Sequence, residues 1–324
     1  MKFRILFAVL PVLFVAACGS PMTPTTMMAP ANDTVGGVEL IAGFHPPKPG
    51  ANQTVFVSPV IPGIKPGTDV TYCSYIDLSF SQTSDVVDFR MYQSNGGHHA
   101  ILYGARKHMP SDTHVCTEDD MVNASQFIAG GGAESMAQAN FKIPDGLAFT
   151  VIGGSQLMIQ THWISTGSTM VDGQAVLYMT TQPSDGTRQT LDLLTVYTTQ
   201  FNVPAQQTGS VVTTCKVKDD IQLLTLVGHE HEWGSRVKVE VINGTGTVNN
   251  VWEHAWQPAF QTDPPLNLYS KDKPFVLHAG DTMRVTCDWN NTTDTALTFP
   301  REMCVGSGFY FPSRGELDCG DGNW

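Results

Sequence analysis

The chain has 324 residues and a formal net charge of −12, because 30 acidic residues outnumber 18 lysines and arginines. Binding to nucleic acid relies on basic side chains that neutralise phosphates, so this balance argues against a nucleic-acid partner. Only 15% of the residues are charged and 30 are glycines, a composition that favours β structure. The length allows two domains, each with its own core.

The N-terminus has the features of an export signal. Lys2 and Arg4 form a short basic region, and the apolar run that follows them is too short to span a bilayer comfortably. We therefore expect residues 1–17 to be a signal peptide. No later apolar run is long enough to cross a membrane.

The end of this signal resembles a bacterial lipobox. Small residues lead into Cys18 in the order Val15-Ala16-Ala17-Cys18. In such a motif the cysteine becomes the lipidated first residue of the mature protein; an ordinary signal peptide with a chance cysteine is the alternative. Lipidation predicts an exported protein that is held in the cell envelope by its lipid alone. Ser20, where such lipoproteins of the inner membrane have aspartate, favours the bacterial outer membrane.

The chain changes character near residue 54. Residues 18–53 are rich in proline, threonine, methionine and alanine, which predicts a flexible tether. Beyond them, short segments alternate apolar and polar residues between turns, a pattern typical of β-sandwiches. The clearest alternation covers residues 69–78, 86–92, 157–163, 236–242 and 283–289. The sequence thus predicts an all-β fold.

A turn signal divides this β region into two parts. Pro183-Ser184-Asp185-Gly186 favours a turn, and one histidine-rich cluster lies on each side of it. We expect an N-terminal β-sandwich over residues 54–188 and a C-terminal one over residues 189–324.

Six cysteines remain after Cys18, and their even number in an oxidising compartment predicts three disulfides. They are Cys73, Cys116, Cys215, Cys287, Cys304 and Cys319. Fifteen pairings are possible for six cysteines. No CxxC pair exists, which argues against a thiolate zinc site.

The first histidine cluster is a pair of neighbours, His98 and His99. Adjacent side chains of an ideal strand point to opposite faces, so one metal can bind both only where the backbone twists or bulges. Gly96 and Gly97, directly before the pair, make such a distortion easy. His162 lies on an alternating strand and could supply a third imidazole.

The second cluster is His229-Glu230-His231. On a strand, His-x-His places both imidazoles on one face at chelating distance, while the intervening Glu230 points away. We expect Glu230 to be solvated or to support the ligands. Met303 precedes Cys304 and could add a thioether; two imidazoles with a thioether favour copper, especially Cu(I). Zinc hydrolases also use His-x-His, but that alternative leaves Met303 and the first cluster unexplained.

Taken together in order, these motifs resemble the copper type II, ascorbate-dependent monooxygenases, the family of peptidylglycine α-hydroxylating monooxygenase and dopamine β-monooxygenase. The resemblance runs from about Thr71 to Cys319. Its anchors are Thr71-Tyr72-Cys73, His98-His99, Cys116, Gln160-Thr161-His162, Cys215, His229-Glu230-His231, Gly280-Asp281-Thr282, Cys287, Met303-Cys304 and Cys319. Each anchor is weak alone, but the ordered set is specific.

The resemblance implies two tandem jelly-roll-like antiparallel β-sandwiches, with one copper ion in each across a solvent-filled gap. The copper that transfers electrons would be held by His98, His99 and His162. The copper that binds dioxygen would be held by His229, His231 and Met303. The implied disulfides are Cys73–Cys116, Cys215–Cys319 and Cys287–Cys304. Gln160 matches a glutamine proposed to link the two copper regions, with an ordinary polar strand residue as the alternative.

Two departures from the family bear on the substrate. Peptide-amidating members have an arginine two residues before His-x-His and a tyrosine three residues after the Met-Cys pair, where this chain has Val227 and Ser307. A bidentate clamp for a substrate carboxylate is therefore missing, which argues against a peptidylglycine substrate. The sequence after Met303 is closer to dopamine β-monooxygenase.

The expected function is that of a copper monooxygenase that hydroxylates a C–H bond of a small organic substrate. It would use O2, two copper ions, and ascorbate or a similar small reductant; the catalytic residues would be His229, His231, Met303 and Gln160. The alternative is a copper-binding or copper-handling lipoprotein without catalysis.

Overall fold

Strands make up most of the computed structural model, as the sequence predicts. The structure describes residues 33–76, 80–132, 142–165, 167–261, 264–299 and 301–322. Helical structure in these residues amounts to α1 (Glu118–Asn123) and the 3-10 turn η2 (Pro258–Gln261). None of their helices is long and apolar enough to cross a membrane. The expected signal peptide and Cys18 lie outside the described residues.

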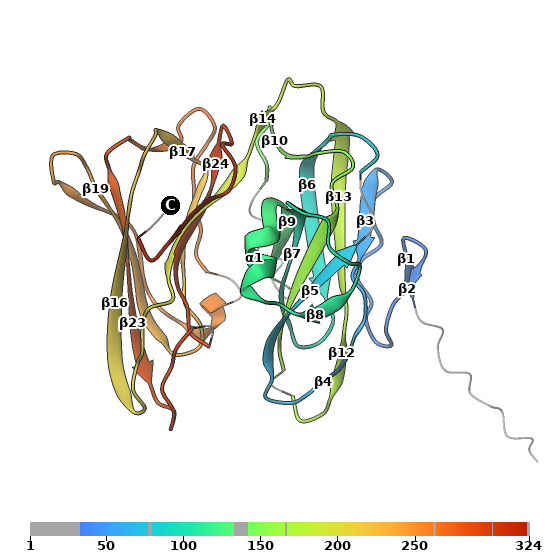
Figure 1. Ribbon diagram of the computed structural model, residues 1–324, viewed down its shortest axis with the longest axis horizontal. Coiled ribbons are helices and arrows are strands. Elements are labelled where there is room, and N and C mark those ends of the chain that lie inside the picture. Colours follow the sequence, from blue (N-terminus) through green and yellow to red (C-terminus); the bar gives the residue numbers. More distant parts are fainter. Residues whose placement is uncertain are drawn as a thin grey trace, which may run out of the picture. The chain divides into compact units, whose positions relative to one another are not determined.

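The N-terminal half contains two five-stranded sheets (Figure 1). One has the order β14 (Gln189–Thr190), β10 (Leu147–Val151), β6 (Ser84–Gln93), β13 (Ala175–Pro183) and β3 (Gln53–Val57). The other has the order β8 (Thr113–Val115), β5 (Asp69–Ile76), β11 (Leu157–Ile164), β7 (Gly97–Ala105) and β9 (Ala124–Gly132). Side chains from both sheets share one core, in which Phe149 of β10 packs with Leu102 of β7 and Ile159 of β11. The half is therefore a β-sandwich.

Residues 33–53 correct the expectation of a tether that reaches residue 53. They form β1 (Thr34–Val35), β2 (Val38–Glu39) and the start of β3, and they bury Leu40 and Phe44 against Val176 and Tyr178 of β13. These β13 side chains alternate with those of the main core, so the segment covers the outer face of the strand. A few apolar residues among prolines and glycines are enough to dock it.

A small sheet of β4 (Ile61–Ile64) and β12 (Val171–Gly173) lies at one end of this half (Figure 1). Ile61 and Ile64 pack there against Trp163, which is fully buried. Trp163 directly follows His162, so this cluster anchors the end of β11 that carries the candidate ligand.

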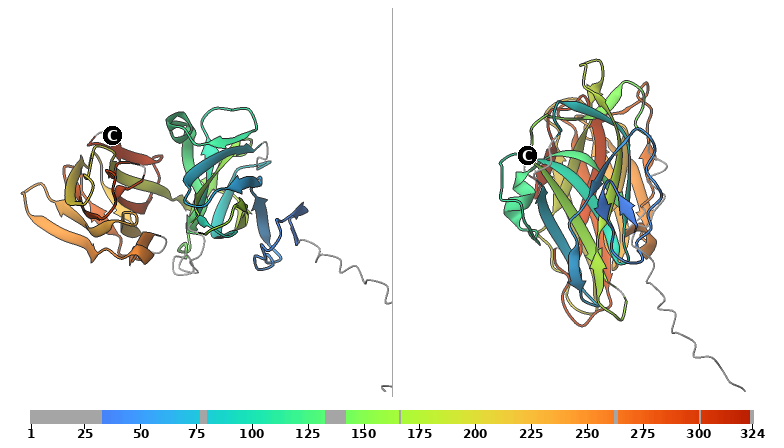
Figure 2. Two further views of the ribbon diagram at one scale, coloured as in Figure 1. Left: turned by 90° about the horizontal axis from the view of Figure 1, so that it is seen from below. Right: turned by 90° about the vertical axis from the view of Figure 1, so that its right-hand side faces the viewer.

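The C-terminal half also contains two sheets. The path of the larger is β21 (Asn267–Leu268), β18 (Thr225–His229), β24 (Cys304–Phe311), β15 (Asp192–Thr198) and β25 (Leu317–Gly320), with β17 (Ile221–Leu223) and β22 (Phe275–Leu277) beside it. The smaller is β16 (Gln207–Lys216), β23 (Thr282–Asn291), β19 (Gly234–Ile242) and β20 (Val248–Ala255). Val239, Val285 and Trp289 of the smaller sheet pack on Leu194 and Val196 of β15, which makes a second sandwich core. Figure 2 gives two further views of the strands.

The change from one pair of sheets to the other falls between β14 and β15, at Leu191. Residues 32–324 nevertheless form one compact unit. Leu224 and Phe311 of the C-terminal half are buried within the first core, so the two halves share apolar side chains.

The three disulfides that the resemblance implies are confirmed: Cys73–Cys116, Cys215–Cys319 and Cys287–Cys304. The first joins β5 to the residue before the cap of α1. The last joins β23 to the first residue of β24, next to Met303.

Candidate metal centre

His98 and His99 reach one site because β7 is irregular at this point. His99 is the Cα partner of His162 on β11, but the next pair is Gly97 with Trp163, so His98 is an extra residue. Gly96 has φ +79°, and a Cβ on Gly97 would lie 2.4 Å from Gln93 Cβ. The expected bulge after the glycine pair is therefore confirmed, and it turns both imidazoles to one side.

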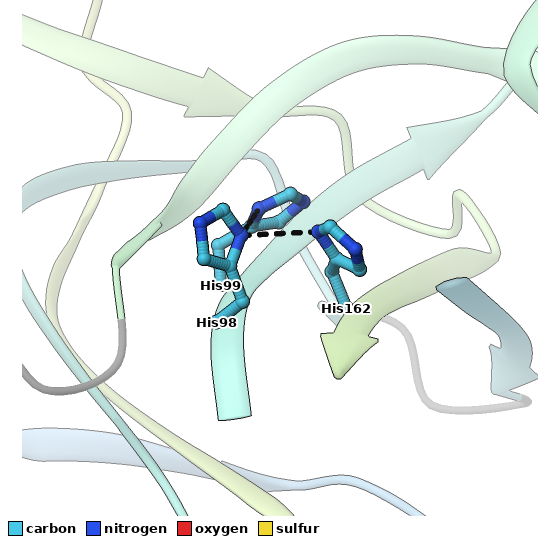
Figure 3. A group of neighbouring side chains, drawn as sticks. All are labelled: His98, His99 and His162. Atoms are coloured by element: carbon cyan, nitrogen blue, oxygen red, sulfur yellow. Dashed lines mark hydrogen bonds between the residues drawn. The ribbon is translucent and has the colours of Figure 1, made fainter. Parts of the chain in front are cut away.

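The rings of His98, His99 and His162 point toward one another (Figure 3). His98 Nδ1 lies 3.0 Å from His99 Nδ1 and 3.0 Å from His162 Nδ1. The three side chains offer ligand atoms that all lie within 4.8 Å of one another. The structure thus brings together the three histidines that the sequence predicts for the first metal.

In each ring, Nδ1 is the inner nitrogen, which faces the shared site, and Nε2 is the outer nitrogen, which faces away from it. The partners of the outer nitrogens show whether the inner nitrogens carry a hydrogen. His98 Nε2 lies 2.9 Å from the Gln261 carbonyl oxygen, and His162 Nε2 lies 2.6 Å from Asp69 Oδ1. A carbonyl or a carboxylate can only accept, so each Nε2 carries the hydrogen, and in a neutral ring Nδ1 is then an acceptor. Two acceptors that face each other at 3.0 Å cannot bond to each other. A cation between them would satisfy both, so the donor set fits a metal.

His99 has a weaker partner of the same kind. Its Nε2 lies 3.4 Å from Gln160 Oε1, which leaves its Nδ1 for the shared site. Gln160 also donates to Met121 Sδ at 3.0 Å. Both of these contacts stay in the N-terminal half; the role of Gln160 as a link between two coppers stays a prediction.

Burial keeps the imidazoles of His98 and His99 uncharged. Burial first, and then the charges of His99 and His162, lower the pKa of His98 to about 2. Burial and the same kind of repulsion hold the pKa of His99 well below its usual range. Metals bind the neutral ring, so the rings of His98 and His99 are in the ligating form at physiological pH.

The second cluster lies at the end of β18. His229 is the last residue of that strand and pairs with Val305 of β24, and the ring centroids of His229 and His231 are 5.2 Å apart. His231 Nδ1 lies 3.1 Å from the Arg301 carbonyl oxygen, to which it donates. His231 Nε2 is buried with no hydrogen-bond partner among the described residues. An orphaned imidazole nitrogen of this kind fits a metal ligand.

Met303 is half-buried and lies two residues before the partner of His229 on β24. Continuing the antiparallel register would place it opposite His231. Arg301 and Glu302 both bond to His231, so the segment leading into Met303 lies against the second cluster. The ligand role of Met303 stays a prediction.

The two histidine sets are closer than a solvent-filled gap would allow. Ring centroids lie 6.0 Å apart for His98 and His231, 6.1 Å for His162 and His231, and 6.5 Å for His98 and His229. The expected gap is therefore wrong for this structure. Its absence has a local cause, since the Gln261 carbonyl of the C-terminal half bonds to His98 of the N-terminal half.

Glu302 is a structural support that the sequence reasoning missed. Its buried carboxylate accepts from His231 N at 2.9 Å, Trp233 N at 2.7 Å and Trp289 Nε1 at 3.0 Å. Burial raises its pKa to about 7, although these hydrogen bonds oppose the shift. Glu302 thus ties one candidate ligand, His231, to the residue next to another, Met303.

Glu230 was expected either to be solvated or to support the ligands, and the first of these expectations is wrong. Its side chain is fully buried, and neither carboxyl oxygen has a hydrogen-bond partner among the described residues. Burial, then the charge of Glu302, raises its pKa to about 10, so it is uncharged near neutrality. Glu232 is exposed.

A surface cavity lies away from both histidine sets. It has a volume of about 590 Å³ and lies along β6 and β10, where Arg90, Lys142 and Arg188 contribute to its wall. None of the candidate ligands lines it.

The comparisons with known proteins bear on the C-terminal half. Residues 187–321 match the family model described as copper type II ascorbate-dependent monooxygenase, C-terminal domain. This range contains His229, His231 and Met303, whereas the first histidine set lies before it. No curated protein matches the chain.

Solved structures give only weak likenesses. A recombinant N-glycanase F (PNGase F) is 10% identical with a TM-score of 0.35, over 82% of this chain and 97% of its own. The major capsid protein P2 from bacteriophage PM2 is 8% identical with a TM-score of 0.33, over 81% and 98%. PNGase F from Flavobacterium meningosepticum is 10% identical with a TM-score of 0.29, over 82% and 91%. Likenesses this weak indicate nothing about chemistry.

Proposed function

We propose that this protein is a copper-dependent monooxygenase, because residues 187–321 match the family model of the copper type II ascorbate-dependent monooxygenase C-terminal domain. It hydroxylates a C–H bond of a small organic substrate. One oxygen atom of O2 enters the substrate and the other leaves as water, which consumes two electrons and two protons. Ascorbate, or a similar small reductant, supplies the electrons.

The observation that carries this proposal is the donor set. Three imidazole nitrogens without hydrogens converge at His98, His99 and His162, and a fourth is orphaned at His231. When bound, copper supplies the activation of dioxygen and the one-electron steps. His98, His99 and His162 would hold the electron-transfer ion, and His229, His231 and Met303 would hold the ion on the oxygen side.

The chain's own residues perform three tasks in this proposal. The hydrogen bonds from His98 and His162 to outer acceptors fix the orientation of the rings. The ring centroids of His98 and His231 lie 6.0 Å apart, so ions held by the two histidine sets would be close enough to exchange electrons. Glu302 holds the His231 segment beside Met303, so that the oxygen side keeps its geometry.

The substrate side lacks a group that would grip a carboxylate. Val227 and Ser307, which stand where peptide-amidating members have arginine and tyrosine, are cross-strand partners on β18 and β24. The Ser307 hydroxyl is already used, since it donates to the Leu194 carbonyl oxygen at 3.0 Å. We therefore propose a substrate other than a peptide with a C-terminal glycine.

The test is oxygen consumption by copper-loaded protein with ascorbate and a panel of small substrates. Met303→Ile should abolish coupled turnover while the first site still binds copper, because only the second set loses a ligand. His98→Ala should remove one copper and the electron supply. Full loading with two copper ions but no oxygen uptake above the autoxidation of ascorbate would contradict the enzyme and favour a copper-handling protein.

We also propose that the protein is a lipoprotein of the bacterial outer membrane, anchored through Cys18. The support is the sequence alone, as the segment lies outside the described residues. Cys18→Ser should move the protein from the membrane fraction to the soluble envelope fraction, and mass spectrometry of the wild-type N-terminus should find a diacylglyceryl cysteine. An unmodified N-terminus would contradict the anchor.

A further inference from the structure

Among the residues that the structure describes, Asp69 is the side chain with the shortest hydrogen bond to a candidate ligand. It is the first residue of β5, and its Oδ1 lies 2.6 Å from His162 Nε2 on the neighbouring β11. In the register of these strands His162 pairs with Thr71, and Ile164 pairs with Asp69. Asp69 is therefore the diagonal neighbour of His162 on the same face of the sheet. The His162 side chain is 4% exposed and that of Asp69 is 40% exposed.

The contact determines which nitrogen of His162 carries the hydrogen. The carboxylate of Asp69 accepts, so it stabilises the tautomer with the hydrogen on Nε2. In that tautomer the Nδ1 lone pair faces His98 Nδ1 at 3.0 Å.

The other tautomer has a stable arrangement of its own. The Gln261 carbonyl holds the hydrogen of His98 on Nε2, so His98 Nδ1 is an acceptor. If the hydrogen of His162 moved to Nδ1, it would donate to His98 Nδ1 across the same 3.0 Å. This internal hydrogen bond would occupy two of the three inner nitrogens and close the site to a metal. Asp69 opposes that arrangement.

We propose that Asp69 is the positioning residue of the first metal site, and that it keeps His162 in the ligating tautomer. Its carboxylate also places a negative charge next to a bound cation. Outer partners of this kind raise metal affinity 10- to 100-fold in characterised sites. The choice of copper as the metal rests on the proposed function, whereas the tautomer does not.

The first experiment reads the tautomer in the metal-free protein. Long-range ¹H–¹⁵N correlation spectra distinguish the two ring nitrogens of each histidine. In the wild type, His162 should carry its hydrogen on Nε2, and in Asp69→Ala it should shift toward Nδ1. An unchanged His162 tautomer in Asp69→Ala would overturn the proposal.

The second experiment measures copper affinity by competition with a Cu(I) chelator, in a His231→Ala background that leaves the first site. Asp69→Ala should weaken binding 10- to 100-fold. Asp69→Asn should fall between, because its amide oxygen can still accept but its charge is gone. If Asp69→Ala fails to fold, Asp69→Val, which also removes the acceptor, replaces it in the first experiment, and Asp69→Asn serves in the second. If the Asp69 variant binds copper as tightly as the His231→Ala protein that keeps Asp69, the proposal is overturned.

Asp112→Ala is the matched control. Asp112 also contacts a histidine, at 3.1 Å from His114 Nδ1, but His114 is not a candidate ligand. Its removal should leave copper affinity unchanged; an equal loss in both variants would mean that Asp69 acts only through general stability. A protein that binds copper as expected but does not consume oxygen would contradict the proposed function and leave the role of Asp69 measured.

Discussion

At the scale of single residues, the acceptors around the histidines determine what the site can bind. Gln261 and Asp69 each hold a hydrogen on an outer ring nitrogen, and Arg301 does the same for His231. Each inner nitrogen is thereby left as a lone pair directed into the site. The specificity for a cation therefore lies in the acceptors as much as in the histidines themselves.

Glu302→Ala should be strongly destabilising. It leaves three buried donors without an acceptor, at His231, Trp233 and Trp289, and each such donor costs about 1–3 kcal/mol. We expect the free energy of unfolding to fall by at least about 3 kcal/mol in urea denaturation. Glu302→Gln should lose less, since one amide oxygen remains. The exposed Glu253→Ala is the control, and a Glu302→Ala protein as stable as this control would refute the role.

We predict that His114 makes a pH-dependent contribution to the free energy of unfolding. Burial alone would lower its pKa, but hydrogen bonds and charges from Asp120 and Asp112 outweigh burial and raise it. A group whose pKa is raised in the folded state stabilises the fold at pH values below its unfolded pKa, which is about 6.5 for histidine. This stabilisation is lost as the pH rises through the folded-state pKa. The wild type should therefore exceed His114→Gln in unfolding free energy by more at pH 5.5 than at pH 8.5. An equal difference at both pH values would contradict this.

At the scale of elements, a pair of glycines lets the strands of the second cluster pack closely. Gly228 of β18 and Gly306 of β24 are cross-strand partners. A Cβ on Gly228 would lie 2.5 Å from Trp252 Cζ3 and 2.5 Å from Val237 Cγ1, and one on Gly306 would lie 2.7 Å from Val285 Cγ2. The glycines thus bring the sheet that carries His229 against the second core.

Gly228→Ala should move β18 away from this core, because neither Trp252 nor Val237 has room to withdraw. Overpacking of this kind costs about 1–3 kcal/mol. Copper binding at the second set should weaken, since His229 is the next residue, while the first set keeps its affinity. Gly244→Ala, where a Cβ would meet no atom within 4 Å, is the matched control. Equal stability of the two variants would contradict the packing argument.

Features that depend on short spacing could be predicted from the sequence. Alternation indicated the strands, and Gly96-Gly97 indicated the bulge that brings His98 beside His99. Hydrogen bonds across long separations gave no such signal: Asp69 and His162 are 93 residues apart, and Glu302 and His231 are 71. The docking of Leu40 and Phe44 was missed because two apolar side chains in a proline-rich segment form no period.

At the scale of the whole molecule, residues 32–324 are joined by more than the chain connection. Phe309 of β24 packs against the first core, with its ring centroid 5.2 Å from that of Phe127 and 5.1 Å from that of Phe149. Leu224 and Phe311 of the same half are buried there too. The short distances between the two histidine sets therefore rest on apolar packing as well as on the bond from His98 to Gln261.

Phe309→Ala should make the two halves unfold independently of each other. Removing a buried phenylalanine ring costs about 3–5 kcal/mol, and this partly buried ring should cost somewhat less. Because the lost contacts join the halves, we expect urea unfolding to change from one cooperative transition into two, followed by tryptophan fluorescence and far-UV circular dichroism. Phe299→Ala, which removes a ring that is 43% exposed, is the control and should unfold like the wild type. A single transition shifted to lower urea in Phe309→Ala would show that the halves stay coupled without this ring, and that Leu224 and Phe311 are sufficient to hold the two histidine sets together.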